Sequence, residues 1–168
     1  MFVRYYVELP HPADRVEGAL LHAPAEWLSA LAGAADQRGD GLLAEVGVGP
    51  LGPRLRRRVT VHLGTPVRLP STTLLPFTWR PTSNNGLLPD LDGDIELGAL
   101  GPGHTQLALS ARYTPPLGSL GRTADRVLLH RIAEATVKDF LDRLAEALLH
   151  PAAVNGNGGG GRALEDGR

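Results

Sequence analysis

The fold of this chain is decided by residues 91–148, which read LDGDIELGALGPGHTQLALSARYTPPLGSLGRTADRVLLHRIAEATVKDFLDRLAEAL. Two segments rich in alternating apolar residues, about 93–100 and 105–114, are joined by Gly-Pro-Gly-His, a connection of hairpin length. From about 118 to 149 the apolar residues recur at helical spacing, with charged residues on the opposite side. A helix of roughly 48 Å must lie across something wide. The stretch therefore predicts antiparallel strands followed by one long helix that packs across them.

The preceding residues supply the rest of that sheet. Further strands are expected at residues 2–8, 42–48, 55–64 and 72–81. Between residues 12 and 36 the helical pattern is interrupted by Pro24, which predicts two short helices with the proline near the first turn of the second. The predicted class is α+β, with a curved antiparallel sheet of about six to seven strands. Residues 1–150 are expected to form one domain, and the Gly-rich residues 151–168 a disordered tail.

Composition narrows the class of protein. The chain has 168 residues, a formal net charge of −1 and no cysteine. This balance gives no reason to expect a nucleic-acid partner, and disulfide and thiolate chemistry are excluded. No apolar run reaches the roughly 18 residues of a membrane span, and the N-terminus is too polar for a signal peptide. A single lysine among many arginines and alanines is typical of a GC-rich bacterial genome. These features predict a soluble, cytoplasmic bacterial protein.

Three short motifs suggest ligand sites, and spacing argues against each. GVGPLG (47–52) matches GxGxxG, but a strand rather than a helix is expected to follow it. GSLGRT (118–123) is shorter than a phosphate-binding loop and lacks its lysine, so its glycines are expected to form the corner between strand and helix. RLRRR (54–58) would place Arg56 and Arg58 on one solvated face, with an anionic partner as the minority interpretation. Six scattered histidines give no metal-ligand spacing, so neither a metal nor a cofactor is expected.

The element order, together with residues 91–148 and the N-terminal stretches YVELPHPADRVEGAL and AEWLSALAG, resembles the START-like superfamily, also called SRPBCC. That superfamily includes polyketide cyclases and lipid-transfer domains. The likeness spans about residues 1–150 and carries no catalytic signature. It implies the helix-grip fold, in which a curved sheet grips the C-terminal helix around an apolar cavity. The cavity is expected to hold a hydrophobic small molecule such as a lipid, a quinone or a polyketide.

Strand and helix phases indicate which side chains would face that cavity. Tyr113 continues the phase of the apolar positions in its strand, and Thr136 lies at the edge of the apolar arc of the helix. Core packing and ligand lining both remain possible for these residues, because the cavity wall is the core. The expected lining residues are Val61, Leu63, Phe77, Trp79, Leu97, Leu107, Leu109, Tyr113, Ile132, Thr136 and Phe140.

Three functions fit this expectation. The first is a binding module that encloses a hydrophobic small molecule and opens at residues 64–71, at residues 82–90 or at the short helices. The second is an aromatase or cyclase, for which Tyr113 and Thr136 are the candidate proton donors or acceptors. The third is a protein-interaction module that uses the same groove. The sequence does not indicate an oligomeric state.

Overall fold

The computed structural model describes residues 1–32, 42–47, 56–82, 90–114 and 126–150. In these ranges, one strand and two helices are followed by six strands and a final helix. In chain order they are β1 (Phe2–Leu9), α1 (Ala13–His22), α2 (Pro24–Ala32), β2 (Leu42–Gly47), β3 (Arg56–Leu63), β4 (Val67–Arg68), β5 (Thr72–Pro81), β6 (Asp90–Gly101), β7 (His104–Thr114) and α3 (Arg126–Leu149).

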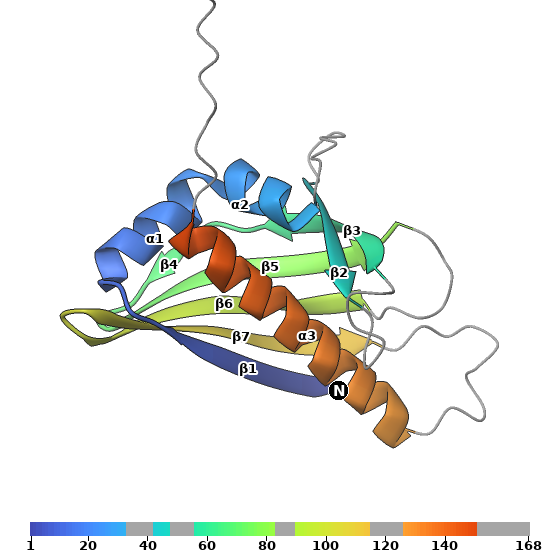
Figure 1. Cartoon of the computed structure of the whole chain (residues 1–168). Coiled ribbons are helices and arrows are strands. Elements are labelled where there is room, and N and C mark those ends of the chain that lie inside the picture. Colours follow the sequence, from blue (N-terminus) through green and yellow to red (C-terminus); the bar gives the residue numbers. More distant parts are fainter. Residues whose placement is uncertain (33–41, 48–55, 83–89, 115–125, 151–168) are drawn as a thin grey trace, which may run out of the picture.

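The strands form one antiparallel sheet in the order β1-β7-β6-β5-β3-β2, with the short β4 paired to β5. Helix α3 lies diagonally across one face of this sheet, and α1 and α2 gather beside its C-terminal end (Figure 1). Because α3 contacts both β1 and β2, the two ends of the strand order, the sheet must curve around the helix. The predicted α+β helix-grip architecture is confirmed.

Alternation of side chains decides which face of each strand meets α3. In β5, Leu75, Phe77 and Trp79 are buried, whereas the residues between them are partly exposed. The same period of two marks the inner face of β7, where Leu107, Leu109, Ala111 and Tyr113 point inward, although the small Ala108 in the opposite phase is also buried. Period-two burial on one face is expected of a sheet covered on one side only. The core is therefore a single layer between sheet and helix.

Two glycines shape the β6–β7 hairpin. A Cβ placed on Gly93 would lie 2.1 Å from the backbone oxygen of Ser110, so only glycine lets the two strands approach this closely. Gly101 has a φ of +150° and coincides with a shift in strand register, next to the turn formed by Pro102 and Gly103. The expected Gly-Pro-Gly-His hairpin connection is confirmed.

The boundaries differ from the predictions in a few places. Strand β6 begins at Asp90, before the predicted start near residue 93, because its acidic side chains lie on the outer face beside Arg80 of β5. Arg80 Nη2 is 2.8 Å from Asp92 Oδ1, and its Nε is 3.6 Å from Asp90 Oδ2. The two-residue β4 was not predicted. The predicted helix start at 118, the GSLGRT motif and the Gly-rich tail lie outside the described residues. Within the described ranges, no helix is long and apolar enough to cross a membrane.

Candidate functional site

The side chains predicted to line a cavity meet between the sheet and α3, and most are completely buried. Nine of them, from Val61 to Phe140, have at most 3 % of their surface exposed, while Leu63 and Ile132 are half-buried. Aromatic rings fill the centre of this space. The Phe140 ring centroid on α3 lies 5.1 Å from that of Phe77 and 5.5 Å from that of Trp79. These are ordinary distances for packed aromatic pairs, so these three rings contact one another between the sheet and α3.

Tyr113, the predicted polar group at the end of β7, reaches the N-terminal half of α3. Its Oη lies 3.1 Å from His130 Nδ1, and the two rings stack at a centroid distance of 6.1 Å. His130 Nε2 in turn lies 3.2 Å from Glu134 Oε1. The Tyr113 hydroxyl donates to Met1 Sδ at 2.6 Å. Its oxygen therefore faces two partners, and which group donates in the contact with His130 Nδ1 depends on the imidazole tautomer.

The environment of Tyr113 favours a protonated hydroxyl. Burial of the ring, and to a smaller extent the negative charge of Glu134, raise the pKa of Tyr113 above its ordinary value of 10.0. Tyr113 can therefore donate a proton in a hydrogen bond, but it cannot act as a base at neutral pH. Sequence reasoning identified Tyr113 and missed His130 and Glu134, although their spacing of four on one helix was a visible signal.

Thr136, the other candidate for acid–base chemistry, is bonded to its own helix. Its Oγ1 donates to the backbone oxygen of Ile132 at 2.7 Å, and the residue is fully buried. This i to i−4 bond is the usual way for a threonine inside a helix to satisfy its hydroxyl. The bond explains how a polar residue is accommodated within the apolar face of α3.

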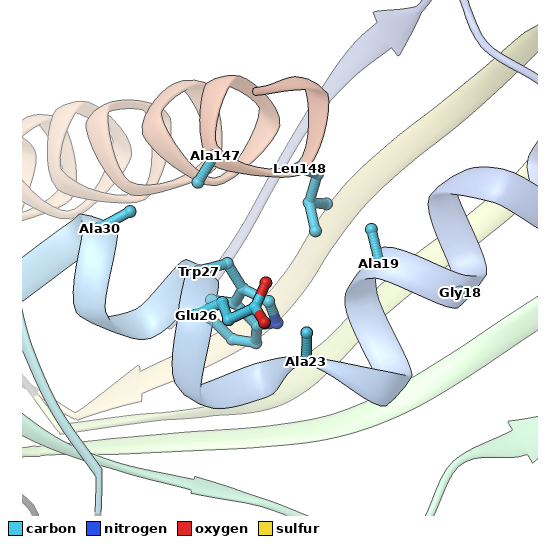
Figure 2. Close-up of a pocket in the computed structure, with 8 residues that line it drawn as sticks. All are labelled: Gly18, Ala19, Ala23, Glu26, Trp27, Ala30, Ala147 and Leu148. Atoms are coloured by element: carbon cyan, nitrogen blue, oxygen red, sulfur yellow. The ribbon is translucent and has the colours of Figure 1, made fainter. Parts of the chain in front are cut away.

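An open groove lies at the other end of α3, between that helix and the short helices α1 and α2. It has a volume of about 300 Å³. Most of its lining side chains are small. Leu148 extends from α3 toward Ala19 of α1, and the Glu26 carboxylate is seen in front of the Trp27 indole (Figure 2). The lining residues are Gly18, Ala19, Ala23, Glu26, Trp27, Ala30, Ala147 and Leu148.

The local sequence explains why this hollow exists. Trp27 Nε1 donates to the backbone oxygen of Leu20 at 3.1 Å, which fixes the indole between α1 and α2. A Cβ added to Gly18 would meet no atom within 4 Å, so the chain leaves open space there. A shallower hollow of about 390 Å³ shares Ala30 and Ala147 with the groove and extends it toward Arg143 and His150. Sequence analysis predicted an opening at the short helices but missed these small residues, because only the crossing of the helices brings them together.

The groove is apolar at its floor and charged at its margin. Trp27 and Leu148 belong to the same hydrophobic core as Phe77 and Phe140. Glu26 is exposed at the rim of the groove. Among the described residues, no group of three or more histidine and carboxylate side chains could hold a metal ion. The arrangement is suited to an apolar molecule with one polar end.

Comparison with known proteins gives a consistent answer for the fold. No family model and no curated protein matches the sequence. A START superfamily protein from Mycobacterium smegmatis superposes with a TM-score of 0.58 at 11 % identity, covering 90 % of this chain and 99 % of that one. The Zhui aromatase/cyclase from Streptomyces sp. R1128 superposes at 0.53 with 13 % identity, covering 93 % and 98 %. Ara h 8.0201 superposes at 0.52 with 12 % identity, covering 89 % and 99 %.

Proposed function

We propose that this protein, whose fold is START-like, binds a hydrophobic small molecule of the lipid, quinone or polyketide class in the groove between α1, α2 and α3. The groove itself is the observation that supports the proposal. Most of its lining residues are apolar, and the buried side chains of Trp27 and Leu148 form part of its wall. A ligand that buries about 200 Å² of apolar surface there would gain about 5 kcal/mol before the costs of association.

The sheet–helix space forms the wall behind this site. Trp27 and Leu148 belong to the same core cluster as Phe77, Trp79 and Phe140, so buried side chains continue from the groove into the interior. A larger ligand could therefore extend inward only by displacing these side chains. The cavity proposed from the sequence, between sheet and helix, would be reached through the groove.

The two tryptophans of the chain allow the site to be located directly. Trp27 lies in the groove and Trp79 in the sheet–helix interior, and the chain has no other tryptophan. In Trp79→Phe the only tryptophan is Trp27, in the groove. In Trp27→Phe the only tryptophan is Trp79, in the interior. Titration with the neutral apolar dye N-phenyl-1-naphthylamine should quench Trp27 emission by energy transfer, with saturation at one dye per chain.

A blocking variant completes this test. Ala19→Leu places a larger side chain in the groove and should raise the dissociation constant of the dye at least about tenfold. Ala25→Leu is the matched control, because it makes the same change at an exposed position of α2 outside the groove. Equal dye affinity in Ala19→Leu and wild type would refute the groove as the site.

The Tyr113–His130–Glu134 chain supports a second candidate function, proton donation in a cyclase-type reaction. A carboxylate that orients an imidazole, which in turn contacts a hydroxyl, is a common acid–base arrangement. His130 and Ala147 are separated by seventeen positions of α3, or about 26 Å of helix rise, so this chain does not act on a ligand in the groove. Loss of turnover of a poly-β-ketone thioester in Tyr113→Phe, with dye binding unchanged, would support catalysis. No turnover by the wild-type protein would exclude it.

A further inference from the structure

Strand β1 leaves one of its edges open. It is the terminal strand of the sheet, and among the described residues only β7 pairs with it (Figure 1). Met1 and Tyr113 exchange two backbone hydrogen bonds of 3.0 and 2.8 Å. This pair determines which residues of β1 form backbone hydrogen bonds with β7. Backbone groups of the odd-numbered residues therefore bond to β7. Those of Phe2, Arg4, Tyr6 and Glu8 point to the open edge.

The side chains of these even-numbered residues lie on the outer face of the sheet. Phe2 and Tyr6 are 59 % and 57 % exposed, which is unusual for aromatic residues. Arg4 and Glu8 have opposite charges and stand two positions on either side of Tyr6. Sheets commonly protect an edge with lysine, proline or a bulge. From Phe2 to Leu9, strand β1 has no lysine, proline or bulge and carries charge only at Arg4 and Glu8, so its edge is regular and open.

We propose that β1 pairs antiparallel with β1 of a second copy of this chain, with Tyr6 on the two-fold axis. In this register Arg4 stands opposite Glu8 of the partner subunit, and the reverse pair forms as well. Opposite charges directly across a strand pair are favourable, and like charges are unfavourable. Each of these facing pairs also exchanges two backbone hydrogen bonds, because all members point to the open edge.

Charge and polarity select this register over its neighbours. Centring the pair on Arg4 or on Glu8 would place like charges against each other. Setting Arg4 opposite Tyr6 would leave Glu8 facing the Phe2 ring. With Tyr6 at the centre, the inner face also matches, since Val3 then stands opposite Leu9 and Tyr5 opposite Val7. Both faces of the proposed β1–β1 interface are thus complementary.

The present partners of the two charges are compatible with this pairing. Arg4 Nη2 lies 2.7 Å from Glu96 Oε2 on β6, and the Arg4 side chain remains 52 % exposed. Glu8 is exposed and has no ion pair among the described residues. A second copy would supply each Glu8 with a cation and each Arg4 with a second carboxylate. The interface uses neither the groove nor Tyr113, so the ligand-binding proposal can fail without affecting it.

The test is the oligomeric state of the full-length protein and of charge variants, measured by sedimentation velocity across a range of concentrations. Wild type should dimerise, and Arg4→Glu and Glu8→Arg should each raise the dimer dissociation constant at least about tenfold, because both place like charges across the β1–β1 interface. A one-to-one mixture of the two variants should restore a heterodimer, which a simple folding defect could not do. A wild type that stays monomeric, or a mixture that does not associate, would overturn the proposal.

A cross-linking experiment then tests the register. The chain has no cysteine, so one introduced thiol is unique. In the proposed register the Cα atoms of Tyr6 and Tyr6 of the partner subunit are about 5.5 Å apart, within disulfide range. Tyr6→Cys should form a disulfide-linked dimer on mild oxidation. Arg4→Cys, whose two copies would be about 14 Å apart, should not. Equal cross-linking of both variants would refute this register.

Discussion

Replacing Phe140 with alanine tests whether the sheet–helix space is packed core. Phe140 is fully buried and contacts the rings of Phe77 and Trp79, so Phe140→Ala removes the centre of the aromatic cluster. Phenylalanine-to-alanine substitutions in cores cost about 3–5 kcal/mol. For a chain of this length, about 4 kcal/mol corresponds to a fall of about 8–16 °C in the unfolding midpoint.

Urea unfolding followed by circular dichroism measures this loss. The control is Phe2→Ala, which removes the same ring from a position that is 59 % exposed and should change the free energy of unfolding by less than about 0.5 kcal/mol. Both variants are measured at low micromolar concentration, so that association does not contribute. The denaturant dependence of the free energy should be the same in all three proteins if only stability changes.

For Phe140→Ala we also expect that a small apolar ligand restores part of the lost stability. Removal of the Phe140 ring should leave an apolar cavity that accepts a small aromatic molecule such as benzene. Benzene should therefore raise the unfolding midpoint of Phe140→Ala and leave that of wild type unchanged. A loss below about 1 kcal/mol, or equal benzene stabilisation of wild type, would show that the interior is already hollow and would refute the packing argument.

Three further substitutions probe the fold and its polar groups. Tyr113→Phe removes the hydroxyl that contacts Met1 Sδ and His130 Nδ1 and should cost about 1 kcal/mol in urea unfolding. Folding raises the pKa of Tyr113, so as pH rises the unfolded state loses this proton before the folded state does. The free energy of unfolding of wild type should therefore fall as pH rises above 10.0. Tyr113→Phe should lack this contribution to the pH dependence. Gly93→Ala should prevent or severely impair folding, judged by soluble yield and circular dichroism, whereas Gly103→Ala, whose Cβ meets nothing within 4 Å, should behave as wild type. Thr105→Val removes a buried 2.7 Å bond to a backbone carbonyl in the bend after β1 and should cost about 1–3 kcal/mol by the same assay; an unchanged value would mean that the carbonyl finds another partner.

The sequence by itself determined the architecture, because the fold depends on local periodicity. Alternation placed Leu107, Leu109 and Tyr113 on the inner face of one strand, and the spacing of apolar residues identified α3 as the covering helix. Pro24 correctly predicted the boundary between the two short helices, because proline is tolerated in the first turn of a helix and not in its interior. Burial on one face of each element is a property of the segment itself, so it can be read without knowing the neighbours.

Tertiary structure alone decided which of these buried residues enclose space. Phe77 and Trp79 lie on β5 and Phe140 lies on α3, and the distance at which α3 crosses the sheet brings their rings into contact. The groove arises where residues of three helices, such as Ala19 of α1, Ala30 of α2 and Ala147 of α3, come together, and no periodicity within one helix encodes that meeting. Whether side chains fill a space or leave it open depends on the angles and distances between elements. Those are set by the packing of the whole core.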